Sequence, residues 1–208
     1  MLNRRLQVLF TLLVACSGLS FAGPQDEKVR AKEITVTEPE FGDLYSLLHV
    51  RKYSGTFALQ GNVSEVGFRI DFYKNGRKTS ESFAGAWNGF KEPRPASGRF
   101  SVQVADLDYL PLAGGKKGML RFDVALTILD KGTSSLSWEH DIPKAVFDPS
   151  RSTRGGGTFS GEASEKGGIP LFWKLAQDGT NVGTGNTPDD VLKENPAADI
   201  LIAYLLYK

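Results

Sequence analysis

The sequence is short of the residues that build the commonest catalytic and metal sites, with 1 Cys and 2 His among 208 residues. A zinc site needs about four ligands, mostly His, Cys and carboxylates, and neither His49 nor His140 has a second His or Cys at the short spacing of a zinc motif. A single Cys cannot form a disulfide framework, so a hydrophobic core must stabilise the fold. The sequence therefore predicts no metal site and no cofactor.

An excess of charge of one sign is also missing. The chain has 25 Lys and Arg against 24 Asp and Glu, a formal net charge of +1. No run of Lys or Arg is longer than two residues, so no local basic stripe compensates for the neutral total. Because binding to nucleic acid depends on neutralising phosphates, nucleic acid is not an expected partner.

Long apolar runs are absent except near the N-terminus. Arg4 and Arg5 precede an apolar stretch at residues 6–15, and small residues follow it. This is the order of an export signal, and the stretch is shorter than the roughly 20 residues that span a bilayer. We therefore expect a signal peptide at residues 1–22, a flexible lead-in at 23–31 and one domain at 32–208 without a transmembrane helix.

Two processing sites compete within this signal. Leu13-Val14-Ala15-Cys16 resembles the lipobox of bacterial lipoproteins, which implies an acylated Cys16 and a membrane-anchored protein. Ser20-Phe21-Ala22, before Gly23, has the small residues that ordinary signal peptidase requires, which implies a periplasmic or extracellular protein. Both possibilities stay open.

Strict alternation of apolar and polar residues is the clearest structural signal. Residues 64–74 place four apolar side chains on one phase, Val66, Phe68, Ile70 and Phe72. Asn75-Gly76 follows and predicts a type I′ turn, with a return strand at 78–83. The same alternation at 120–128 and 136–142 predicts a second hairpin, in which Phe122 faces inward and Arg121 outward.

The remaining patterns extend this scheme to about eight strands. Further strands are expected at 32–37, 56–59, 100–104, 169–175 and 199–207, the last apolar on both phases and so covered on both faces. Short helices are expected at 41–50 and at 191–194, and long loops at 88–98, 143–168 and 177–187. With few helices and no βαβ alternation, this predicts an all-β single domain, an antiparallel β-sandwich or jelly roll.

Two places in the sequence are candidate binding sites. Asp106 and Asp108 share a face if residues 103–109 are extended, a spacing that suits one cation or acid–base chemistry. Trp87 lies between small residues that would leave its indole open for stacking, whereas Trp138 and Trp173 fall in phase with apolar neighbours and should face inward.

These observations predict an exported, non-enzymatic binding domain. Its expected partner is a protein or a glycan of the bacterial cell envelope, because long polar loops on a β scaffold suit recognition and the catalytic inventory is small. A structural or assembly subunit of the envelope is one alternative. A hydrolase that uses Asp106, Asp108 or His140 is the other.

Overall fold

The computed structural model describes residues 30–37, 50–85, 87–109, 117–130, 132–151, 153–159 and 168–208. The predicted signal peptide with Cys16, nearly all of the lead-in, and the helix expected at 41–50 lie outside the described residues, apart from Val50, which begins a strand. Ten strands form one antiparallel sheet: β1 (Arg30–Thr37), β2 (Val50–Lys74), β3 (Arg77–Lys78), β4 (Phe83–Ala84), β5 (Asn88–Asp106), β6 (Met119–Asp130), β7 (Gly132–Pro143), β8 (Thr153–Thr158), β9 (Ile169–Gln177) and β10 (Asp199–Tyr207). The all-β class is confirmed. Packing of two separate sheets is not confirmed, because all ten strands are joined by hydrogen bonds.

The 25-residue strand β2 organises the sheet. The strand order is β7-β6-β5-β2-β10-β9-β8, and β1, β3 and β4 also pair with β2. The first part of β2 pairs with β1 and β5, and the last part with β10. Between them lies Gly61 at φ 94°, where the register shifts, and such a bulge lets a strand bend sharply. The two strands expected at 56–59 and 64–74 are therefore one bent strand.

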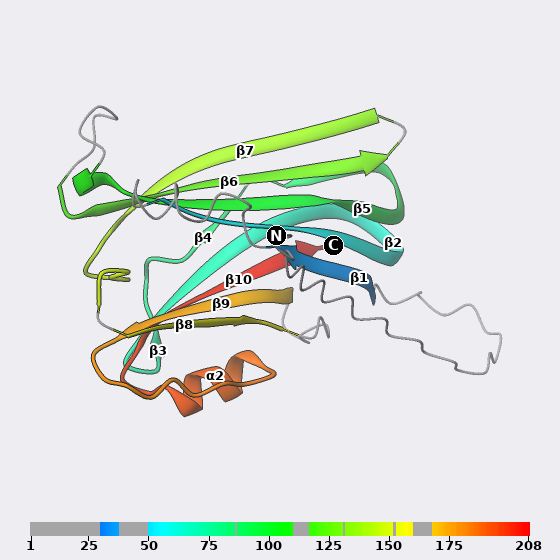
Figure 1. Cartoon of the computed structure of the whole chain (residues 1–208). Coiled ribbons are helices and arrows are strands. Elements are labelled where there is room, and N and C mark those ends of the chain that lie inside the picture. Colours follow the sequence, from blue (N-terminus) through cyan, green and yellow to red (C-terminus); the bar gives the residue numbers. More distant parts are fainter. Residues whose placement is uncertain are drawn as a thin grey trace, which may run out of the picture.

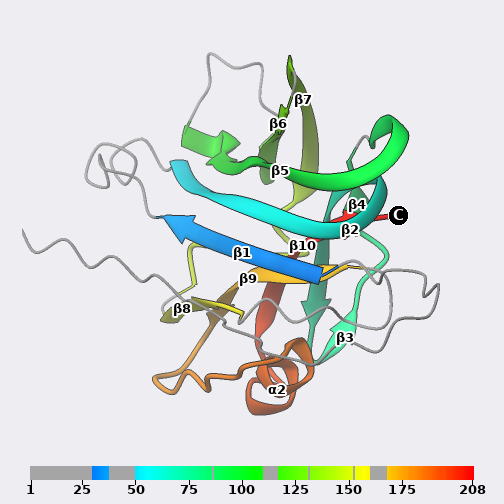
Figure 2. The ribbon, with the colours of Figure 1, turned by 90° about the vertical axis from the view of Figure 1, so that its right-hand side faces the viewer.

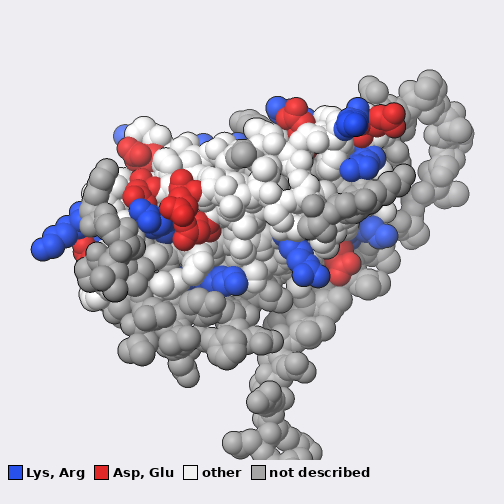
Figure 3. Space-filling view, turned by 90° about the horizontal axis from the view of Figure 1, so that it is seen from above, with Lys and Arg blue, Asp and Glu red and all other residues white. Residues whose placement is uncertain are grey.

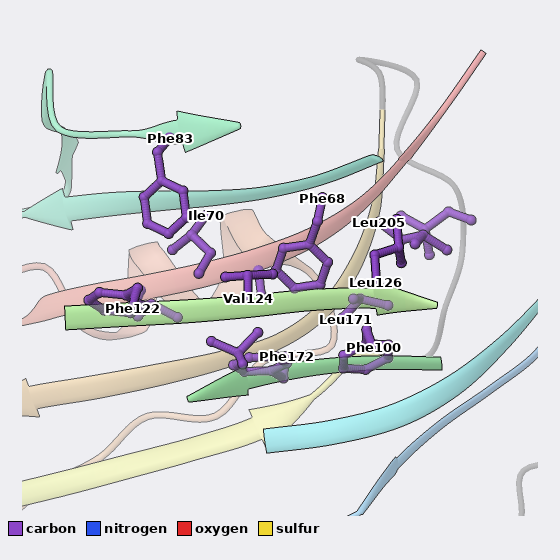
Figure 4. Close-up of a cluster of buried hydrophobic side chains, with 14 of the residues drawn as sticks. Phe68, Ile70, Phe83, Phe100, Phe122, Val124, Leu126, Leu171, Phe172 and Leu205 are labelled. Atoms are coloured by element: carbon purple, nitrogen blue, oxygen red, sulfur yellow. The ribbon is translucent and has the colours of Figure 1, made fainter. Parts of the chain in front are cut away.

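The sheet curls so that its concave face encloses the main core. Seen from the end, β6 and β7 lie at the top, and β9 and β8 lie below them, above α2 (Figure 2). Side chains of β2, β5, β6, β9 and β10 point toward one another between these halves (Figure 4). Phe72 of β2 and Phe122 of β6 meet edge to face at 5.5 Å, and both are fully buried. Burial of each such ring contributes about 1.5–3 kcal/mol to the free energy of unfolding. The residues that the alternation predicted to face inward therefore stabilise the fold.

A second, smaller core lies on the opposite face of β9 and β10. Helix α2 (Pro188–Glu194) lies beneath these strands (Figure 1), and its Val191 is fully buried against them. Strand β10 is covered on both faces, as its two-phase apolar pattern predicts. Thr187 caps α2 with a capping box. In the described parts of the chain, no helix is long and apolar enough to cross a membrane.

Two of the three expected loops contain strands. Residues 88–96 of β5 pair with β2 but not with β6, which pairs only from Gly98 onward. Pro93 and Pro95 therefore lie where β5 has no second neighbour among the described residues, and there a missing N–H costs no ladder bond. Within 143–168 the glycine run of β8 pairs with β9, because Trp173 and Lys174 lie against glycines that leave room for them.

The hairpins differ in how well they follow the prediction. β6 and β7 pair in continuous register as expected, and Asn75 and Gly76 have the positive φ angles of the predicted turn, 50° and 71°. The prediction of one return strand at 78–83 is wrong, since two short strands, β3 and β4, pair with β2 there instead.

Candidate functional site

The two acids that the sequence singles out meet at a lysine. Asp106 ends β5, and Asp108 lies in the short 3-10 helix η1 (Leu107–Tyr109), so the extended geometry expected for 103–109 is wrong beyond Asp106. Lys144 Nζ lies 2.5 Å from Asp106 Oδ1 and 2.5 Å from Asp108 Oδ2. The carboxylates are close, as predicted, but a cation of the chain itself lies between them.

The charges of Lys144, Asp106 and Asp108 stabilise one another and so hold these residues in place. The hydrogen bond from Lys144, together with one from the Gly118 amide, lowers the pKa of Asp108. Burial disfavours the Lys144 ammonium, but hydrogen bonds to Asp106 and Asp108 outweigh that effect and raise the pKa of Lys144. A general acid needs a pKa near the working pH, which Asp108 does not have. The cluster instead ties η1 to the residue that follows β7.

Trp87 is 37 % exposed but is not an open platform. A Cβ built on Gly67 would lie 2.9 Å from its indole, so the ring lies against the backbone of β2. Lys208 Nζ lies 4.3 Å from the ring centroid and 2.6 Å from Glu65 Oε2. The chain's own residues therefore already use part of the surface that a ligand would need.

The other rings have structural surroundings. Trp138 is half-buried against the main core, and Trp173 is buried in the second core on the opposite face of the sheet. His140 is half-buried, with its ring centroid 4.7 Å from that of Phe83, while His49 lies outside the described residues. No group of three or more His, Cys, Asp or Glu in the described ranges could hold a metal ion.

A groove that sequence reasoning missed lies across β1, β2, β5 and β6. Its volume is about 320 Å³. Five side chains that line it carry a hydroxyl group: Thr35, Ser54, Thr56, Ser101 and Thr127. The other lining residues are Lys52, Arg99, Gly55, Phe100 and Ala125. The strand register explains why they meet, because Thr35, Thr56, Arg99 and Thr127 are successive cross-strand partners, as are Ser54, Ser101 and Ala125. Each of these residues lies on the phase opposite to the core.

Gly55 allows the strands around this groove to approach. A Cβ on Gly55 would collide with the carbonyl oxygen of Thr35 and with the ring of Phe100. Glycine is therefore required where β1 and the Phe100 ring converge on β2. The sequence signal that marks the groove is the presence of small hydroxyl residues on the outward phase of four strands, where charged residues are more usual.

The charge of the groove is positive. Among the described residues, Lys52 and Arg99 are the charged residues that line it, and no described acid does. Within the part of the chain that the structure describes, neither forms an ion pair, whereas Arg69, Arg121, Lys144 and Arg151 do.

The acidic residues of the β6–β7 hairpin lie outside the groove lining. Asp123 and Glu139 are cross-strand partners near the end of β7, and Arg121 holds Asp141 at 2.8 Å. Burial, reinforced by Glu139, raises the pKa of Asp123. In Figure 3, acidic side chains gather toward one end of the face in view, and a broad uncharged area adjoins them.

Comparison with known proteins adds no assignment to this geometry. The sequence matches no protein-family model, and no curated protein is significantly similar to it.

Proposed function

We propose that the protein is an exported, non-enzymatic binding domain of the bacterial cell envelope, and that its ligand lies in the groove between β1, β2, β5 and β6. The groove is the observation that carries this proposal. Its volume of about 320 Å³ falls in the range of small-ligand sites, about 300–1,000 Å³. Hydroxyl groups both donate and accept hydrogen bonds, so the lining suits a polar ligand such as a segment of a glycan.

The site residues expected from the sequence do not support a better alternative. Asp106 and Asp108 are bound to Lys144, which argues against a carboxylate hydrolase. Trp87 lies outside the groove lining, so stacking on its indole is not part of the proposed site.

Export is supported by the order of basic, apolar and small residues in 1–22. Intact-mass measurement of the protein recovered from cells tests it. A chain that starts at Gly23 indicates a periplasmic or extracellular protein, and an acylated Cys16 indicates a lipid anchor. An unprocessed Met1 in the cytoplasm would contradict export.

Binding is tested with a panel of envelope glycans and envelope proteins, using the wild type, Ser101→Phe and Trp87→Ala. Ser101 lies on the outward phase of β5, where an aromatic residue is tolerated in a strand, so the substitution fills the groove without disturbing the core. We expect Ser101→Phe to abolish binding and Trp87→Ala to leave it unchanged. The reverse pattern would move the site to Trp87, and hydrolysis that disappears in Asp108→Asn would contradict a binding function.

A further inference from the structure

We propose that the ligand of the groove is a linear acidic oligosaccharide whose acid groups bind Lys52 and Arg99. This inference rests on the proposed function and names the chemical class of the ligand. It is carried by three observations: two groove cations that have no ion-pair partner among the described residues, the strand register that separates their backbones, and the hydroxyl lining between them.

The charge of the groove selects an anion. Lys and Arg are both protonated at neutral pH, and no acid of the described ranges lines the groove to neutralise Lys52 or Arg99. Most of the other cations that form side-chain contacts in the described ranges face a carboxylate, as Arg121 faces Asp141. An anion entering the groove therefore gains charge-assisted hydrogen bonds without displacing an internal partner.

The positions of the two cations indicate a ligand with more than one acid group. Lys52 and Thr56 are four residues apart on β2, which is about 13 Å along a strand. Arg99 is the cross-strand partner of Thr56, so the backbones of the two cations stand near opposite ends of the groove. Two acid groups on an extended chain match this separation better than one compact anion does.

The lining between the cations indicates a carbohydrate. The side chains of Thr35, Thr56 and Ser101 present hydroxyls on neighbouring strands, and these can exchange hydrogen bonds with the hydroxyls of a sugar. The groove's aromatic residue, Phe100, is only 2 % exposed and belongs to the main core. Neutral sugars bind largely by stacking on open aromatic faces, so charge and hydrogen bonds must supply the affinity here.

The test is calorimetric titration of the protein recovered from cells with uronic-acid oligomers of increasing length, with neutral oligomers of the same lengths, and with an acidic peptide. We expect the acidic oligomers to bind, and binding to strengthen at the length that reaches both cations. Lys52→Gln and Arg99→Gln should each raise Kd about tenfold or more. Added salt should weaken binding, because it screens exposed charges.

Matched variants separate charge from folding. Arg99→Lys keeps the charge and should retain most of the affinity that Arg99→Gln loses. Lys193, exposed on α2, serves as a control, and Lys193→Gln should leave Kd unchanged. Circular dichroism of each variant confirms that the sheet is intact.

The outcomes distinguish this inference from the function on which it rests. Neutral oligomers that bind as tightly as acidic ones, insensitivity to both charge-removing variants, or tighter binding of the acidic peptide would each overturn the acidic oligosaccharide. The proposed binding function would still hold if Ser101→Phe abolished the binding of the neutral oligomers or of the peptide. If no ligand of either panel binds in a way that Ser101→Phe abolishes, the proposed function itself is wrong.

Discussion

Lys144 Nζ lies 2.5 Å from Oδ1 of Asp106, a carboxylate whose side chain is only 7 % exposed. Asp106 Oδ1 also accepts a hydrogen bond from the Asp108 amide at 3.0 Å, so the aspartate directs the turn from β5 into η1. Lys144 directly follows β7, and its amide donates to the Gly118 carbonyl at 2.8 Å. The side chain and the backbone of Lys144 together thus join the end of β7 to the β5–η1 turn and to the segment before β6.

Removing this cation should destabilise the fold. Lys144→Met keeps the length of the side chain but leaves Asp106 buried without its partner, and breaking a buried pair in this way costs about 3 kcal/mol. Urea denaturation at pH 7 measures the change in the free energy of unfolding. Lys193→Met, at an exposed position on α2, is the control and should change it by less than about 0.5 kcal/mol. Equal effects at the two positions would show that Lys144 is not an anchor.

The contribution of Asp108 should depend on pH in a defined direction. Because the pKa of Asp108 is lowered from its ordinary value of 3.8, the folded state binds its proton less readily than the unfolded state does. The carboxylate therefore stabilises the fold above pH 3.8, and that stabilisation disappears as pH falls through the lower pKa of the folded state. Urea denaturation of wild type and Asp108→Asn should differ at pH 7 and converge at acid pH. A difference that persists unchanged at the lowest pH would contradict this assignment.

Two substitutions to aspartate, one at a buried and one at an exposed position of the β6–β7 hairpin, test which side chains of β6 face the core. Phe122 is fully buried between Phe72 and Phe83, so Phe122→Asp should cost more than about 4 kcal/mol and unfold the domain. Ser137 is exposed on β7, and Ser137→Asp should leave the circular dichroism spectrum and thermal midpoint nearly unchanged. Arg121 is outward-facing as predicted but holds Asp141, so it is a poorer control. Tolerance of Phe122→Asp would mean that the facing is reversed.

Gly85 should not accept a side chain. A Cβ there would collide with the indole of Trp138, which packs against the main core, so Gly85→Ala should cost about 1–3 kcal/mol by overpacking. Near-ultraviolet circular dichroism should change as the indole is displaced. Gly89 is the matched control, since the nearest atom to its Cβ is Glu65 Cγ at 3.8 Å and Gly89→Ala should be nearly neutral. An unaltered spectrum in Gly85→Ala would contradict the close packing of Trp138.

Local patterns were sufficient for the elements that depend on local chemistry. The alternation at 66–72 identifies the buried face because side chains of a strand point to opposite sides in turn. Asn75-Gly76 identifies its turn because both residues tolerate positive φ, and Thr187 and Pro188 identify the start of α2 because they satisfy and preset its first turn.

The local patterns did not predict which strands pair when they lie far apart in the sequence. Pro93 and Pro95 read as a loop, since a lone sequence does not reveal that this part of β5 pairs with β2 and has no second strand beside it among the described residues. The glycines of β8 also read as a loop, because the side chains that cover them belong to β9.

For the candidate site, the sequence by itself determined the inward and outward phase at 66–72, 100–104 and 120–128, which places Ser101 and Thr127 of the groove on the outward phase. Tertiary structure alone decided that these residues share a groove, since Thr35, Thr56, Arg99 and Thr127 are adjacent only through the register of four strands. It also decided that Lys144 lies between Asp106 and Asp108, and that Lys208 lies on Trp87. The physical reason is that side-chain orientation repeats with the local backbone, whereas register and ion pairing depend on contacts between residues far apart in the chain.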